Sequence, residues 1–210
     1  MLQKRRVPKF IKDLLSFETR AKLRGWETDF YWYVAGMPDP PVSSFKRFLM
    51  KKWSKGFPHD VFIESGTFGG DTVEYFKRRF KKVYSIELEP NIANKAQHRF
   101  VNERNVKIIE GDSAKVIPEI LKEIDSPAVF WLDGHLSAEG TAKGDLETPV
   151  FQEVEAILND PGRRHLIFID DARCFDGTHD YPTVENLKKF VKEKNSNLDF
   201  EIKRDIIIIK

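Results

Sequence analysis

The stretch Val61–Thr72, VFIESGTFGGDT, decides the fold of this chain. It is an apolar run that ends in an acid, and a glycine-rich turn and the polar start of a helix follow. This order predicts a parallel strand, a tight turn and a helix. Ligands of such sheets bind at the carboxyl ends of the strands, so the turn predicts one side of a binding site.

Four later apolar runs also end in acids, at Glu87, at Asp112, at Asp133 and at the pair Asp170-Asp171. We expect strands at 61–65, 82–88, 106–110, 128–133 and 165–170, and helices at 71–80, 91–103, 114–123, 147–159 and 183–194. Strands that alternate with helices of this length indicate βαβ units and a parallel sheet. The carboxyl ends of its strands converge, and therefore the acids predict one shared site.

The last segment, LDFEIKRDIIIIK (198–210), has no room for a helix between its two apolar runs. It predicts a hairpin that turns near 203–205 and adds an antiparallel edge. Residues 1–57 differ in character, because they hold three of the four tryptophans and a proline-rich turn. We interpret 1–57 as an N-terminal helical cap and 58–210 as the main domain. The aromatic run WETDFYWY (26–33) is more easily explained by core or subunit-interface packing than by stacking on a sugar.

The composition excludes several classes of protein. The formal net charge of +2 gives no support for bulk attraction to nucleic acid. The single cysteine, Cys174, excludes an internal disulfide and suits a reducing compartment, so we expect a cytoplasmic location. No apolar stretch approaches the roughly 20 residues of a spanning helix, and we expect no stable membrane insertion.

The alternating sheet and final hairpin of residues 61–210 resemble the Rossmann-like class I methyltransferase fold, which has seven strands with the last antiparallel. The spacing Glu64-x-Gly66-x-x-x-Gly70 resembles the motif acid-x-Gly-x-x-x-Gly of class I enzymes that use S-adenosylmethionine. The resemblance implies a set of cofactor contacts: Glu64, Gly66, Thr67, Phe68, Gly70, Thr72, Glu87, Asp112, Ser113 and Asp133. Glycines at 66, 69 and 70 do not fit the dinucleotide fingerprint G-x-G-x-x-G.

Individual roles follow from the same resemblance. Glu87 is expected to accept hydrogen bonds from the ribose diol, and Glu64 to lie near the amino group of the methionine part. Asp112 and Ser113 are expected beside the adenine. Phe68 stands where many relatives have a third glycine, and the small-molecule enzymes that resemble catechol O-methyltransferase often have an aromatic residue at this position.

Asp133, Asp170 and Asp171 would repel one another unless a cation neutralises them. The motif resembles the metal-dependent enzymes of the catechol and macrocin O-methyltransferase type, and this implies Mg²⁺ or Mn²⁺ on these three acids. The alternative is a set of helix caps and solvated loop acids. His135 stands at the position of the proposed base, with Asp133 beside it. It could instead bind the metal, hydrogen-bond the acceptor, or be a capped loop histidine. Arg173 is expected to contact the acceptor.

The sequence therefore predicts an S-adenosylmethionine-dependent O-methyltransferase that acts on a sugar or glycan hydroxyl with a divalent metal. Two alternatives stay open: a metal-independent small-molecule O-methyltransferase that uses His135 as base, and a noncatalytic cofactor-binding module. The expected partner is a sugar or glycan and not nucleic acid. A homodimer, or fusion to glycosyltransferase domains, is compatible with the sequence.

Overall fold

The computed structural model of the protein describes residues 17–134, 148–160 and 162–210, with side chains described from residue 25 onward. The chain divides into two compact units, one up to Leu49 and one from Met50 to Lys210. Within the described ranges, no helix is both long enough and apolar enough to cross a membrane.

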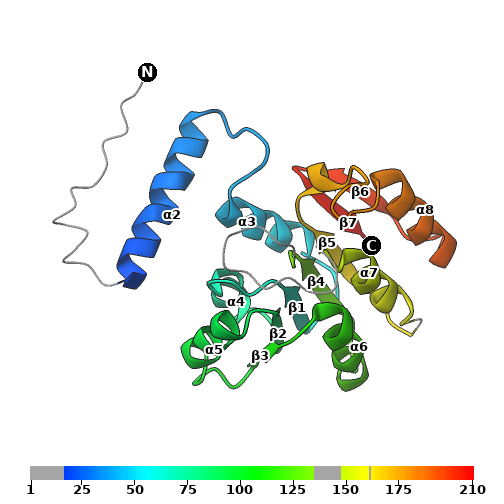
Figure 1. The fold of residues 1–210 in the computed structure, drawn as a ribbon, viewed down its shortest axis with the longest axis horizontal. Helices are drawn as coiled ribbons and strands as arrows, with labels where there is room; N and C mark the ends of the chain where they lie inside the picture. The colour runs from blue at the N-terminus through cyan, green and yellow to red at the C-terminus, as the bar shows by residue number, and fades with distance from the viewer. Residues whose placement is uncertain (1–16, 135–147, 161) are drawn as a thin grey trace. The chain divides into compact units, whose positions relative to one another are not determined.

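The second unit is built on one seven-stranded sheet (Figure 1). Its strands are β1 (Val61–Ser65), β2 (Lys82–Glu87), β3 (Val106–Glu110), β4 (Ala128–Leu132), β5 (Leu166–Ile169), β6 (Phe200–Lys203) and β7 (Ile206–Ile209). The spatial order is β3-β2-β1-β4-β5-β7-β6, in which the first five strands are parallel. The chain winds outward from β1 to β3 and then resumes at β4, so the order reverses between β1 and β4. This is the position at which open sheets of this kind bind ligands.

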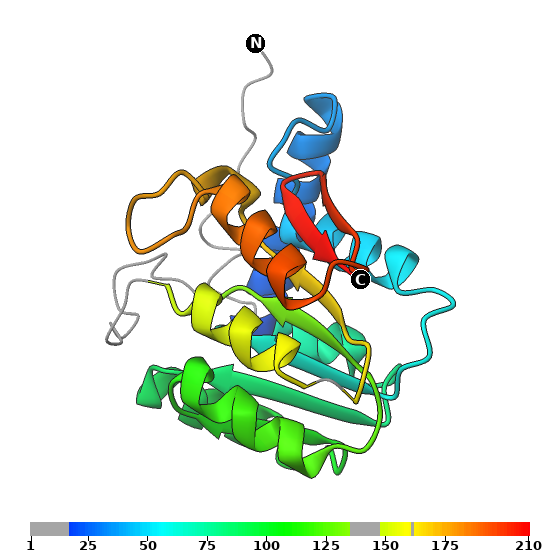
Figure 2. The same cartoon turned by 90° about the vertical axis from the view of Figure 1, so that its right-hand side faces the viewer.

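Helices cover both faces of the sheet (Figure 2). α4 (Asp71–Phe76) and α5 (Pro90–Arg99) lie on one face, and α6 (Ser113–Glu123), α7 (Val150–Leu158) and α8 (Val184–Lys194) lie on the other. The alternation expected from the sequence is confirmed. α4 and α5 end four residues earlier than expected, because turns replace the final helical residues before β2 and β3. A 3₁₀ turn over Ala172–Cys174 was not expected.

The hairpin is confirmed, and the sheet order shows where it sits. β7 pairs antiparallel with β5 on one side and with β6 on the other. Arg204 and Asp205 connect the two strands, and both have positive φ (52° and 61°). Two left-handed residues are the geometry of a tight hairpin loop whose twist matches the strands. All four isoleucines of β7 are buried, so the last strand is interior although it comes last in the sequence.

The core lies between the sheet and α6, α7 and α8. Alternate residues of the strands face these helices, as in Ile63, Phe130 and Ile167, and they pack against helix residues such as Ile157 and Leu187. β1 and β4 are buried along their whole length, as expected for parallel strands covered on both faces.

The described residues of the N-terminal segment are mainly helical. They form α2 (Phe17–Val34) and α3 (Ser43–Trp53), which continues into the second unit. In the first unit, Trp32 Nε1 donates to the carbonyl of Pro38 at 2.7 Å, and its ring lies 4.9 Å from that of Phe45. Ser44 Oγ donates to Asp29 Oδ1 at 2.7 Å. These contacts fix the connection between the two helices.

Candidate active site

Gly66 follows β1 at the point where the strand order reverses. Its φ is +86°, and a Cβ there would lie 2.6 Å from the carbonyl oxygen of Asp133. The backbone of Asp133 in turn donates to the carbonyl of Ser65 at 3.2 Å. The ends of β1 and β4 therefore approach so closely that only glycine fits at position 66. This close approach forms the floor of the candidate site.

Glu87 connects the glycine turn to the end of β2. Its Oε2 accepts a hydrogen bond from the backbone N–H of Phe68 at 2.8 Å, and its Oε1 accepts from that of Glu89 at 3.1 Å. Phe68 has a positive φ of 45°, and its ring is 71% exposed. A carboxylate offers about four lone pairs, so Glu87 retains acceptor capacity beyond these two bonds. The side chain is buried, and its contact with the ribose stays a prediction.

Glu64 belongs to a buried polar network on the α4 side of the sheet. Its Oε1 accepts from Ser85 Oγ at 2.6 Å, and Ser85 Oγ lies 2.6 Å from Thr67 Oγ1. All three side chains are buried. The network connects Thr67, in the turn after β1, to Ser85 of β2 and Glu64 of β1. The contact between Glu64 and a cofactor amino group stays a prediction.

Gly70 and Thr72 lie at the start of α4. Gly70 is the N-cap residue with φ +75°, and a Cβ there would lie 2.7 Å from the ring of Phe100. Ring packing from α5 therefore explains this glycine, in addition to the close ligand approach expected from the sequence. Thr72 is half-buried in the first turn of the helix.

Asp112 caps α6. Its Oδ1 accepts from the backbone N–H of Ala114 at 3.0 Å, and Lys115 Nζ lies 3.3 Å from its Oδ2. Ser113, the next residue, is buried. Asp112 is therefore the N-cap residue of α6, a role that the sequence reasoning did not assign to it, and the adenine contact of the two residues stays a prediction.

Glu153 is a site residue that the sequence reasoning missed. It lies in the first turn of α7 and is 1% exposed. Burial raises the pKa of its carboxyl to about 7, although the nearby hydroxyls of Ser113 and Ser65 lower it. A polar residue on the apolar stripe Val150, Val154, Ile157 was the available signal.

Asp170 and Asp171 follow β5 and are both buried. Asp170 Oδ1 accepts from the backbone N–H of Asp171 at 2.7 Å. Asp171 Oδ1 lies 2.8 Å from Arg173 Nη1, and the same Nη1 also contacts Asp205 Oδ2 from the hairpin turn. A guanidinium therefore lies between the carboxylates of Asp171 and Asp205.

The predicted metal site is not assembled by this arrangement. Among the described residues, no three His, Cys, Asp or Glu side chains are placed to hold a metal ion. Oxygen ligands of the right chemistry are present in Asp133, Asp170 and Asp171, but the carboxylate of Asp171 is paired with Arg173. The described residues as placed do not fit a divalent cation.

Tyr181 approaches the same strand ends. Burial raises the pKa of its hydroxyl well above the usual value, and the neighbouring Cys174 and Asp171 raise it further. Asp133 adds to the rise, whereas a hydrogen bond with Thr148 opposes it. The tyrosine therefore stays protonated at neutral pH and can act as a hydrogen-bond donor near Asp133. His135, the predicted base, lies outside the described residues.

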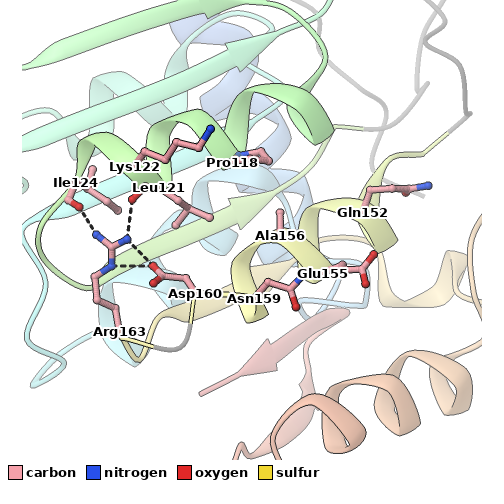
Figure 3. A pocket seen from close by; sticks show the side chains of 10 residues that line it. All are labelled: Pro118, Leu121, Lys122, Ile124, Gln152, Glu155, Ala156, Asn159, Asp160 and Arg163. Atoms are coloured by element: carbon pink, nitrogen blue, oxygen red, sulfur yellow. Dashed lines mark hydrogen bonds and ion pairs between the residues drawn. The ribbon is translucent and has the colours of Figure 1, made fainter.

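A cavity of about 670 Å³ lies elsewhere, between α6 and α7 (Figure 3). Arg163 bounds it and donates to the carbonyl oxygens of Leu121 and Ile124 and to the carboxylate of Asp160. The cavity lies at the carboxyl ends of both helices. Because these helices run antiparallel to the parallel strands, the cavity lies toward the amino ends of the strands, whereas Gly66 and Asp133 lie at the carboxyl ends. None of the predicted site residues lines it.

Comparisons with known proteins agree with this fold. No protein-family model matches the chain. Seventy residues are 36% identical to a "probable ribosomal RNA small subunit methyltransferase A" of Methanosarcina acetivorans. The match covers 33% of this chain and 26% of that relative, so it spans about a quarter of the relative's length.

Two solved structures match over nearly the whole chain. The O-methyltransferase TomG from Streptomyces achromogenes, involved in tomaymycin synthesis and solved with S-adenosylmethionine, has a TM-score of 0.57 at 16% identity, covering 95% of this chain and 92% of that one. An O-methyltransferase from Bacillus cereus, solved with S-adenosylhomocysteine, has a TM-score of 0.56 at 15% identity, covering 96% and 94%. The protein has the Rossmann-like fold of class I S-adenosylmethionine-dependent methyltransferases.

Proposed function

We propose that the protein is an S-adenosylmethionine-dependent O-methyltransferase that transfers a methyl group to a hydroxyl of a sugar or glycan. The observation that carries the proposal is the contact between Gly66 and the backbone of Asp133. It places a glycine turn, and the acid at the end of the neighbouring strand, on either side of the sheet's switch point. Cofactors of open α/β sheets bind at this point.

The cofactor half of the site is already organised. Glu87 is held by the N–H groups of Phe68 and Glu89. This fixes the carboxylate beside the glycine turn, with lone pairs left for the two ribose hydroxyls. A pre-formed acceptor of this kind binds without a reorganisation cost.

Methyl transfer needs an acceptor oxygen in line with the methyl group and a base for its proton. When bound, S-adenosylmethionine supplies the methyl group on a sulfonium that leaves as a neutral thioether. With the cofactor bound, this chain's residues would have to hold the acceptor oxygen in line with the methyl group and accept its proton. His135 is the proposed base that takes the hydroxyl proton, with Asp133 beside it. Tyr181, which remains protonated, is proposed to orient the acceptor by donating a hydrogen bond.

A sugar acceptor is supported by sequence and chemistry together. The segments around Asp133-Gly134-His135 and Asp170-Asp171 resemble those of sugar O-methyltransferases. The described acceptor side presents carboxylates, a guanidinium and a phenol, which are groups that hydrogen-bond neutral hydroxyls. O-methyltransferases are also among the solved structures that share this fold.

Calorimetric titration with S-adenosylhomocysteine tests the cofactor assignment, with NAD⁺ as the control ligand. We expect one-to-one binding of S-adenosylhomocysteine alone. Glu87→Gln should weaken this binding at least tenfold, about 1.4 kcal/mol, because one ribose acceptor loses its charge. Glu110→Gln is the matched control, since this exposed acid ends the neighbouring strand β3. Equal affinity of both variants, or no binding by the wild type, would remove the basis of the proposal.

Ribosomal RNA is a second candidate acceptor, because the matched relative is a ribosomal RNA methyltransferase. The balanced charge of this chain argues against it, as phosphate neutralisation needs an excess of Lys and Arg. The Asn/Asp-Pro-Pro-aromatic motif of amino methylation is also absent from the sequence. Transfer of labelled methyl groups to small-subunit ribosomal RNA, and none to a panel of glycans, would favour this candidate.

A further inference from the structure

The acidic cluster after β5 already contains a cation. Arg173 Nη1 lies 2.8 Å from Asp171 Oδ1 and contacts Asp205 Oδ2. The two acids come from distant parts of the sequence, one from the end of β5 and one from the turn between β6 and β7. The side chains of Asp171 and Asp205 are 11% and 7% exposed. One guanidinium thus stands between two buried carboxylates.

The backbone holds this arrangement from both sides. Asp171 adopts a left-handed conformation with φ 54°, which turns the chain sharply after β5. Asp205 Oδ1 then accepts from the backbone N–H of Arg173 at 2.9 Å, and the carbonyl of Asp205 accepts from that of Ala172 at 3.0 Å. Asp205 therefore binds both the main chain and the side chain of Arg173. The position of the guanidinium follows from the fold and not only from side-chain freedom.

We propose that the Arg173 guanidinium is the resident cation of the acceptor side, in place of a divalent metal. A metal ion on Asp171 would have to displace Arg173 from it or stand as a second positive charge beside the first. Displacement would leave Asp205 buried without its charge partner, which is costly. Juxtaposed cations repel at such short range. The chain's own arginine therefore does the neutralising that the sequence alone assigns to Mg²⁺ or Mn²⁺.

The same geometry indicates which acceptor the site takes, and this step rests on the proposed function. Both carboxylate contacts of the guanidinium use Nη1, and the side chain is 48% exposed. The Nη2 and Nε edge can hydrogen-bond a pair of oxygens in its plane. Among the described residues, the guanidinium lies beside two carboxylates, those of Asp171 and Asp205, and these disfavour an anionic acceptor at its remaining edge. A neutral vicinal diol fits this site better than a carboxylate or a phosphate does.

Mn²⁺ titration of the intact chain tests the proposal, by calorimetry and by the loss of the free-ion electron paramagnetic resonance signal. For the wild type we expect no saturable site with Kd below about 1 mM. Arg173→Ala should gain one, because Asp171 and Asp205 then lack a cation. Its melting temperature should also rise with added Mn²⁺, because a ligand that binds only the folded state stabilises it. Arg173→Lys keeps the charge and should gain no site.

Arg104→Ala is the matched control, since Arg104 is exposed and lies before β3. It should behave as the wild type. If Arg173→Ala does not fold, Arg173→Gln keeps a long polar side chain without charge and carries the same comparison. One-to-one Mn²⁺ binding by the wild type at micromolar Kd would overturn the proposal. A folded neutral variant that gains no Mn²⁺ site would also overturn it, since the cluster would then not be a cation position.

Failure of this inference and of the proposed function can be told apart. S-adenosylhomocysteine binding tests the cofactor site and does not involve Arg173. If the wild type binds S-adenosylhomocysteine and also binds Mn²⁺ tightly, the proposed methyltransferase function stands and the proposal of an internal cation fails. If the wild type binds neither ligand and Arg173→Ala gains Mn²⁺ binding, the proposal of an internal cation stands and the proposed methyltransferase function fails.

Discussion

At the scale of single residues, the buried carboxyl of Glu153 carries an electrostatic cost. Its carboxyl is buried beside Ser65, Ser113 and Gly134. These residues lie at the carboxyl end of β1, at the start of α6 and just after β4. Asp112 raises its pKa further by charge repulsion. An acid held in this position favours its neutral form, because the interior solvates the anion poorly. Stability should therefore depend on the protonation of this residue.

We predict that Glu153→Gln stabilises the protein at high pH. The pKa of the carboxyl is 4.5 when unfolded and about 7 when folded. The folded state binds the proton more tightly, so stability falls as pH rises from 4.5 to about 7 and is constant above that. The shift corresponds to at most about 3 kcal/mol. Urea unfolding should show a gain of up to this size at pH 8 and little change at pH 4.

Glu185→Gln is the matched control for this measurement. Glu185 also lies in the first turn of a helix, α8, but it is exposed. It should change the unfolding free energy little at either pH. Equal unfolding free energies of Glu153→Gln and the wild type at pH 8 would show that the buried carboxyl carries no such cost.

At the scale of elements, a histidine joins β4 and β5 at their amino ends, opposite the carboxyl ends that form the candidate site. His165 precedes β5, and its Nδ1 accepts from the backbone N–H of Ala128 at the start of β4 (3.1 Å). Its Nε2 lies 2.9 Å from Asp160 Oδ2, after α7. Arg163 binds Asp160 and also the carbonyl of Leu121 in α6. This cluster therefore ties α6, β4, α7 and β5 together through a neutral imidazole.

Acid should weaken that junction. Burial lowers the pKa of His165, although Asp160 opposes the shift. The unfolded chain then binds the proton more tightly than the folded one, so this contribution is complete above about pH 6.5 and is lost as pH falls below it. Its sign is opposite to that of Glu153. Urea unfolding at about pH 7.5 and about pH 5, on either side of the ordinary histidine pKa, should show a smaller loss of stability for His165→Gln than for the wild type.

His98→Gln serves as the control, because His98 is exposed on α5 and should leave the acid sensitivity unchanged. His59 also has a lowered pKa from burial, so His165→Gln should remove only part of the effect. If His165→Gln lost stability toward acid as steeply as the wild type, the junction would not titrate.

The elements were predictable where their periodicity is strong. Strands such as β1 and β4 are uninterrupted apolar runs, and turn residues bound them on both sides. The ends of α4 and α5 could not be predicted from the sequence, because helix ends depend on caps and on local packing that a hydrophobic pattern does not contain. The acidic strand ends were also predictable. Their charge partners were not, since Asp205 reaches Arg173 only after the hairpin has folded against β5.

At the scale of the whole molecule, the sheet and its covering helices all belong to the unit from Met50 onward. α3 contributes to that unit through Met50, which is buried, and Trp53, whose ring lies 6.3 Å from that of Phe168. The connection that precedes α3 is held by contacts within the first unit. The core of the second unit is therefore complete once α3 is present.

We predict that the chain shortened to begin at Ser43 still folds. It should unfold in one cooperative thermal transition, with a midpoint within about 5 °C of the full chain, because the loss removes little of the buried core. Circular dichroism and calorimetry measure this. A chain shortened to begin at Trp53 is the comparison and should melt lower, since Met50 is then lost. A Ser43 chain without a cooperative transition would contradict this division of the molecule.

The position of β7 has a consequence for synthesis of the chain. A ribosome releases the N-terminal residues first, so β1 to β5 can pair while the hairpin is still being made. Until β7 arrives, the apolar strand Leu166–Ile169 is an open edge that can pair with another chain. Asp205 arrives in the same segment, and only then can Arg173 be fixed. The strands around the glycine turn can therefore form early in translation, whereas the contact of Arg173 with Asp171 and Asp205 is completed by the hairpin that also covers the open edge of β5.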